Sequence, residues 1–179
     1  MTTRQDVVDF ARPLAGLSAD PACHVKRAMY IALVAPGETE ARGAEMATMS
    51  GCELLALRGI LGAFIDHPLI ANQYRDRKAG EDLLQVGREA HAVRLAGELP
   101  QLGDILIVGG GEDGGGSEHA WTLVGEGEGI DGGQRDAKGF ESIALRQHEI
   151  QNGWDVTSTY RRKIRFLLNT GAILERFGR

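Results

Sequence analysis

The stretch Met49–Gly59, MSGCELLALRG, places a cysteine at the start of an apolar helical pattern. Ser50 can cap this helix, because its hydroxyl can accept a hydrogen bond from an otherwise unpaired N–H of the first turn. Cys52 then lies in that turn, where the helix dipole favours a thiolate. The expected buried face consists of Leu54, Leu55, Leu57, Ile60 and Leu61. Such a pattern is typical of a nucleophilic cysteine, and equally of a small buried core residue.

Length and composition indicate one globular domain spanning residues 1–179. The net charge of −5 gives no support for a nucleic-acid partner or a membrane-surface role. No segment approaches the roughly 18 consecutive apolar residues of a membrane span, and we expect no signal peptide. Cys23 and Cys52 are too few for a disulfide framework, so they form one bridge or remain two free thiols.

Helical patterns fill the first half of the chain. They cover Gln5–Ala11, Ala22–Ala35, the segment from Cys52 to about Phe64, and Glu81–Ala90. Asp20-Pro21 is a helix-start signal, with Asp20 as the expected N-cap of the second helix. The buried face predicted for that helix comprises Val25, Ala28, Met29, Ala32 and Leu33.

Strand patterns fill the second half, before a short closing helix at Thr170–Phe177. They cover Asp104–Val108, Glu118–Val124, Ile130–Gln134, Ser142–Ile150, Trp154–Tyr160 and Lys163–Leu168. Asn152-Gly153 is a strong hairpin signal. The expected fold class is therefore α+β, with N-terminal helices packed on a C-terminal antiparallel β-sheet.

His119 is the histidine best placed to serve as a base for a cysteine. It opens an apolar strand, and Trp121 shares its face, because side chains of a strand alternate with period two. Asp131 follows twelve residues later across the GEGEG turn, which predicts a diagonal neighbour on the same sheet face. A carboxylate there can orient the imidazole and support its charged form. Alternatively, Asp131 is a turn residue before Gly132-Gly133. The other histidines, including His148, are expected to be solvated or structural.

Three alternative sites fit the sequence less well than this arrangement. Gly109, Gly111 and Gly114 satisfy G-x-G-x-x-G, but the strand pattern that follows them is not the helix that a dinucleotide site requires. Glu118 and His119 point to opposite strand faces, which disfavours a metal site with Asp131, so no metal or other cofactor is expected. Cys23 is a rival nucleophile near a helix start, but the carboxylate of Asp20 would oppose its thiolate.

The chain resembles the NlpC/P60 superfamily of papain-like cysteine peptidases and amidases, which includes CHAP-type relatives. The matching pieces are Ser50-Gly51-Cys52 before an apolar helix, Leu102-Gly103-Asp104-Ile105-Leu106, His119-Ala120-Trp121-Thr122-Leu123-Val124-Gly125, and Ile130-Asp131. The similarity covers about Ala28–Gln134. The sequence departs from the family at Gly51-Cys52-Glu53-Leu54, where D-C-S-G is usual, and at Asp131, where histidine is frequent.

The resemblance implies a papain-like fold and a Cys52-His119-Asp131 triad that cleaves an amide, most often in bacterial peptidoglycan stem peptides. Gly51, Glu118 and Trp121 are the residues expected to contact that substrate, and the Gly109–Gly116 loop is expected to border the cleft. A protein made in the cytoplasm would then act in the periplasm or cell wall after specialised export or lysis. The alternatives are a non-catalytic binding or assembly module of a phage or secretion system, and a cytoplasmic thiol enzyme that cleaves a small γ-glutamyl amide.

Overall fold

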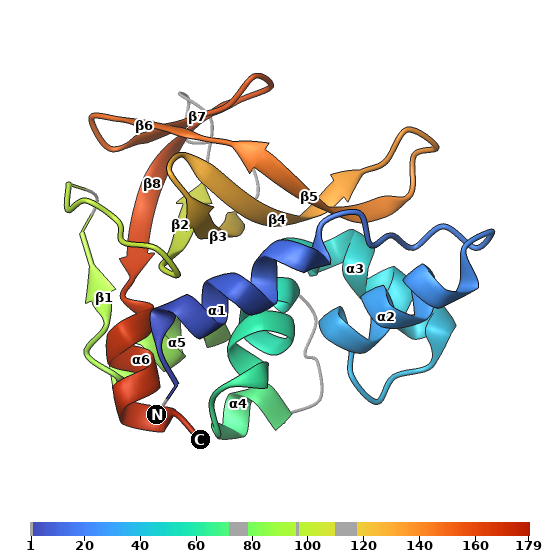
Figure 1. Ribbon diagram of the computed structural model, residues 1–179, viewed down its shortest axis with the longest axis horizontal. Coiled ribbons are helices and arrows are strands. Elements are labelled where there is room, and N and C mark those ends of the chain that lie inside the picture. The colour runs from blue at the N-terminus through green and yellow to red at the C-terminus, as the bar shows by residue number, and fades with distance from the viewer. Residues whose placement is uncertain (1, 72–78, 96, 110–117) are drawn as a thin grey trace.

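The strands form one antiparallel sheet that curls into a half-barrel (Figure 1). The computed structural model describes residues 2–71, 79–95, 97–109 and 118–179. The strands are β1 (Val93–Arg94), β2 (Ile105–Gly109), β3 (His119–Gly125), β4 (Glu128–Arg135), β5 (Glu141–Gln147), β6 (Glu149–Gln151), β7 (Trp154–Val156) and β8 (Arg161–Leu168). Their order is β5-β4-β3-β2-β8-β7-β6, and β1 pairs with β8. The sheet therefore brings β8, from the end of the chain, beside β2.

Helices pack mainly against one face of this sheet, while the β6–β7 hairpin lies away from them (Figure 1). The α-helices are α1 (Arg4–Ala11), α2 (His24–Val34), α3 (Glu40–Leu54), α4 (Pro68–Ala71), α5 (Ala79–Glu89) and α6 (Thr170–Phe177). None of the helices within the described ranges is long and apolar enough to cross a membrane. Helices first and an antiparallel sheet second agree with the predicted α+β class.

A central helical column runs through the core. It begins in α3 and continues through the π-helical turn η2 (Leu55–Ile60) and the 3₁₀ turn η3 (Leu61–Ala63). Every residue from 50 to 61 is buried, including all five apolar residues predicted for this face. Burying one such side chain contributes about 1.5–3 kcal/mol, so this column is a principal source of folding energy.

The predictions for α2 were wrong in two respects. Val25 and Met29 of the expected core face are 75% and 50% exposed, whereas Tyr30, Ile31 and Val34 are buried. Asp20 does not cap this helix, because Cys23 is the N-cap and the Asp20 carboxylate instead accepts the N–H of Ala22 in a turn. Apolar residues follow one another too closely here for spacing alone to choose the buried face.

The strand predictions did not include β1, and the predicted strand Trp154–Tyr160 ends at Val156 as β7. The predicted strand Ser142–Ile150 is divided into β5 and β6, because His148 leaves the ladder between them. The backbone N–H of His148 instead donates a hydrogen bond to the carbonyl oxygen of Gly127. The predicted Asn152-Gly153 hairpin is confirmed, with φ angles of 48° and 82° at these two residues and β6 paired with β7. Positive φ at both central positions is the signature of a type I′ turn.

Two glycines of β4 permit an unusually close approach of α3 to the sheet. A Cβ atom at Gly132 would lie 2.9 Å from the carbonyl oxygen of Gly51 and 3.0 Å from Cδ2 of Leu55. Gly133 has a φ of +82° and sits where the pairing of β4 with β5 shifts register. The glycines therefore let β4 bulge and bring the backbone next to Cys52 against the strand.

We expect Gly132→Ala to destabilise the fold by about 1–3 kcal/mol, because the added methyl group overpacks backbone that cannot move freely. Urea unfolding measures this loss. Gly97→Ala is the matched control, because nothing lies within 4 Å of the position of its Cβ atom. Equal stability of the two variants would contradict the close approach.

Candidate active site

A cleft of about 1000 Å³ opens between the column that carries Cys52 and the curled sheet. Its walls come from three distant parts of the chain, which lie around Cys52, around His119 and around Tyr160. The chemically important lining residues are Ser50, Gly51, Cys52, Glu53, Glu81, Glu118, His119, Gln134, Arg135, Glu141, Arg146, Tyr160 and Arg162. The structure thus brings Cys52 and His119 to one cavity, as the sequence predicts.

Helix α3 breaks at Ser50 and restarts at Gly51. Ser50 has non-helical angles of φ −151° and ψ 32°, which interrupt the helix in its last two turns. Cys52 is therefore in the first turn of the restarted helix, which continues as η2. The first N–H groups of a helix have no carbonyl partner one turn earlier, so a helix restart is a position suited to donors that bind a ligand.

Burial and a neighbouring carboxylate hold the Cys52 thiol in its protonated form. The residue is 7% exposed, and its sulfur donates a hydrogen bond to Oε2 of Glu53 at 2.8 Å. Burial first, and then the charge of Glu53, raise the pKa of the thiol well above its usual value. The expectation that helix position favours a thiolate is therefore wrong for this resting arrangement, because desolvation exceeds the effect of the dipole.

Glu53 is a functional candidate that the sequence pattern did not reveal. It is 8% exposed, and burial raises the pKa of its carboxyl group. The hydrogen bond from Cys52 and the charge of His119 act in the opposite direction but are smaller effects. A helical Glu beside a cysteine would ordinarily point to solvent, and only the packing of the column encloses it here.

His119 and Asp131 meet as the twelve-residue spacing predicts. Nε2 of His119 lies 2.6 Å from Oδ1 of Asp131, and Asp131 is paired across the sheet with Trp121, two residues after His119. The contact has ion-pair distance without hydrogen-bond alignment, a common state of catalytic pairs before substrate binds. Asp131 lies within β4, so its alternative interpretation as a turn residue is wrong.

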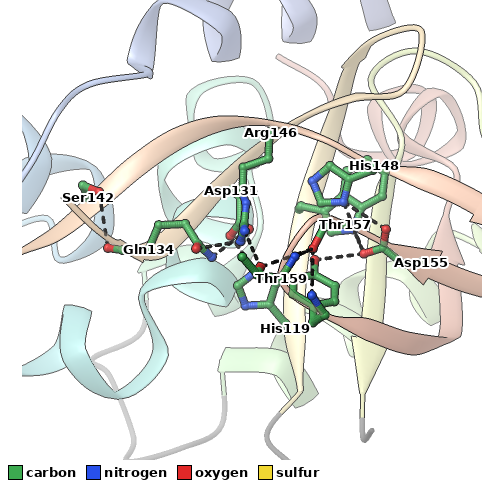
Figure 2. Close-up of polar contacts among 11 residues, drawn as sticks. His119, Asp131, Gln134, Ser142, Arg146, His148, Asp155, Thr157 and Thr159 are labelled. Carbon is green, nitrogen blue, oxygen red and sulfur yellow. Dashed lines mark hydrogen bonds and ion pairs between the residues drawn. The ribbon is translucent and has the colours of Figure 1, made fainter. Parts of the chain in front are cut away.

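Further polar groups fix the carboxylate of Asp131, which is fully buried (Figure 2). Nε2 of Gln134 donates to Oδ2 of Asp131 at 2.9 Å, and the guanidinium of Arg146 lies 3.7 Å from the same oxygen. Arg146 also donates to Oε1 of Gln134 at 2.6 Å. These contacts occupy Oδ2 of Asp131 and leave its Oδ1 facing His119. Because Nε2 of His119 faces Asp131, its Nδ1 is the ring nitrogen available to other groups.

The three predicted substrate contacts have different locations. Gly51 and Glu118 line the cleft, and Glu118 also pairs with Arg165 at 3.4 Å. Trp121 does not line it, contrary to expectation. It shares the sheet face of His119, but its side chain is fully buried in a second, small apolar cluster, and its Nε1–H donates a hydrogen bond to Asp155.

Several other predictions concern residues around the cleft. Cys23 is exposed, both cysteines are free thiols, and only Cys52 lines the cavity. His148 is buried rather than solvated, since its ring contacts Asp155 (Figure 2). The same ring stacks on Trp121. The predicted glycine-rich border Gly109–Gly116 lies, beyond Gly109, outside the described residues. Among the residues that are described, no group of three or more His, Cys, Asp or Glu side chains is placed to hold a metal ion.

We expect Glu53 to make the protein less stable as pH rises. Its folded pKa lies above the ordinary value of 4.5, so the folded state holds the proton more tightly than the unfolded state. The stability that this proton provides is present below about pH 4.5 and is lost as pH rises through the folded pKa. Glu53→Gln should remove this loss and raise stability at pH 7.

Urea unfolding between pH 4 and pH 8 measures the effect. Glu126→Gln is the matched control, because Glu126 is exposed. A Glu53→Gln protein with the pH dependence of the parent chain would show that burial of this carboxyl is not costly.

Comparison with known proteins identifies no relative. No family model matches the sequence, no curated protein matches it, and no solved structure matches the chain. Function must therefore be inferred from the chemistry of this cleft rather than carried over from a relative.

Proposed function

We propose that the chain is a thiol-dependent amide hydrolase of papain-like type, in which Cys52 is the nucleophile, His119 the base and Asp131 the residue that orients His119. The observation that carries the proposal is the 2.6 Å contact of His119 with Asp131 in a cleft that also holds Cys52 at a helix restart. Nucleophile, base and orienting carboxylate come from three elements, which is the usual construction of such a site.

The chemistry follows from these positions. The sulfur of Cys52 attacks the amide carbonyl while its proton passes to His119, and the imidazolium then returns a proton to the departing amine. Water hydrolyses the resulting thioester, with His119 again accepting a proton. The backbone N–H of Cys52, at the restarted helix, is a suitable donor to the developing oxyanion. Asp131 stabilises the charged form of His119 throughout.

Glu53 sets the resting state in this proposal. The thiol proton is directed to Glu53, so the sulfur must turn from this carboxylate toward His119 before it reacts. A substrate that displaces the hydrogen bond between Cys52 and Glu53 would release the nucleophile. Reactivity would then depend on occupancy of the cleft.

The amide that the family resemblance suggests lies in a peptidoglycan stem peptide, with action in the periplasm or cell wall. A second candidate function is a non-catalytic binding module on the same fold. It is favoured by the raised pKa of Cys52 and by the bond of its thiol to Glu53. The two functions differ in the reactivity of Cys52.

Alkylation by iodoacetamide, read separately at each cysteine by peptide mass, tests the proposal. Exposed Cys23 is the internal control. We expect His119→Ala to slow alkylation of Cys52 about tenfold or more and to leave Cys23 unchanged, because the base that takes the thiol proton is lost. Identical Cys52 rates with and without His119 would exclude the triad and favour the binding module.

Hydrolysis of purified peptidoglycan provides the second readout. Cys52→Ser and His119→Ala should each lower the rate of amide cleavage by about 10³-fold or more, and Asp131→Asn by less. Release of new amino groups measures cleavage. If peptidoglycan is inert while Cys52 remains reactive, a γ-glutamyl amide is the next substrate to test.

Substitution of Glu53 separates its role from that of the triad. Glu53→Gln removes a negative charge beside the sulfur, so we expect alkylation of Cys52 at pH 7 to rise about threefold or more. The ratio of Cys52 to Cys23 labelling measures the change. A lower ratio would instead assign Glu53 the role of a base that assists the thiol.

A further inference from the structure

Tyr160 is held rigidly in the wall of the cleft. Its hydroxyl donates to Oδ2 of Asp155 at 3.0 Å. Asp155 is fully buried and also accepts a hydrogen bond from Nε1–H of Trp121 at 3.0 Å. Its Oδ1 lies 3.0 Å from Nδ1 of His148 (Figure 2). A carboxylate with three such partners fixes the ring of Tyr160, which lies in a T-shaped arrangement with the ring of His119 at a centroid distance of 6.2 Å.

Two guanidinium groups lie over this fixed ring. Arg162 is 4.6 Å and Arg146 is 5.6 Å from the ring centroid. Arg146 is already compensated, since it contacts Asp131 and donates to Gln134 and to the hydroxyl of Thr159. Its donors are therefore committed to the support of the triad.

Arg162 differs because, among the described residues, none of the ion pairs around the cleft includes it. It lines the cleft and is half-buried. Asp155 is its partner on the neighbouring strand, but that carboxylate is already bonded to Trp121, Tyr160 and His148. A stacked guanidinium keeps its N–H edge free, and this edge matches the two oxygens of a carboxylate.

We propose that Arg162 is a specificity-determining residue that binds a carboxylate group of the substrate. The inference deepens the proposed function, on which it rests for the position of the reacting amide: the substrate is an amide that bears a free carboxylate near the scissile bond. A singly charged group is favoured over a phosphate dianion, because Glu53, Glu81, Glu118 and Glu141 line the same cleft. Arg162 and Tyr160 thus select the substrate, while Cys52 and His119 act on it.

Two alkylating reagents of nearly equal size test this binding. Iodoacetate and iodoacetamide both form an S–CH₂ bond to Cys52 with loss of iodide and of the thiol proton, but only iodoacetate carries a carboxylate. We expect Arg162→Gln to lower the ratio of the iodoacetate rate to the iodoacetamide rate at Cys52 by about three- to tenfold. Arg162→Lys, which keeps the charge without the planar fork, should give an intermediate ratio.

Arg161→Gln is the matched control. It removes the same charge from the neighbouring residue, which stacks on Trp154 and does not line the cleft. If the ratio of the iodoacetate rate to the iodoacetamide rate at Cys52 falls equally in the Arg161 and Arg162 variants, the effect comes from the net charge of the protein. That result would overturn the proposal.

A binding measurement makes the test independent of the reactivity of Cys52. N-acetylglycine and N-acetylglycinamide are titrated into the ¹⁵N-labelled full chain, and the Nε–Hε signal of Arg162 is identified by its absence in Arg162→Gln. We expect a saturable shift with N-acetylglycine and none with the amide. No shift with either compound, or tighter binding of inorganic phosphate, overturns the assignment. An inert Cys52 together with a retained shift would instead reject the hydrolase and keep the carboxylate site.

Discussion

The close contact between the restarted helix at Gly51 and the bulged strand β4 sets the geometry of the site. Because Gly132 and Gly133 carry no side chains, the backbone beside Cys52 packs directly on β4. The same strand carries Asp131 toward His119 on β3. Larger side chains at these glycines would separate the helix from the sheet, and the sulfur would move away from the imidazole. The arrangement of the cleft is thus a consequence of the tight packing between the restarted helix and β4.

One buried carboxyl group of the site lowers the stability of the fold, whereas another is well compensated by its neighbours. Glu53 is buried beside a thiol, where its ionised form is poorly solvated. Asp131 is also buried, but Gln134, Arg146 and His119 surround it with donors. Functional sites commonly retain buried ionisable groups that lower stability, because the chemistry of the site requires polar side chains that an apolar core would exclude.

The parts of the site that could be predicted from sequence depend on local periodicity. Strand alternation places His119 and Asp131 on one face, and the spacing of leucines identifies the column of Cys52. The positions of Tyr160 and Arg162 depend on the order of strands, which brings the end of the chain to the middle of the sheet. No local pattern encodes that order. Burial of Glu53 and His148 likewise results from tertiary packing, which overrides the polar character of both residues.

The uninterrupted burial of residues 50–61 gives the two walls of the cleft different local stabilities. We expect amide hydrogens in this segment to exchange with solvent through large openings of the domain, because it is packed on nearly every side and only its first residues border the cleft. The opposite wall contains exposed Thr159 and half-buried Tyr160 and Arg162, so its backbone exchanges through smaller openings. Fluctuations of the sheet wall would therefore change the shape of the cleft, while the backbone that carries Cys52 stays in place and only its side chain turns.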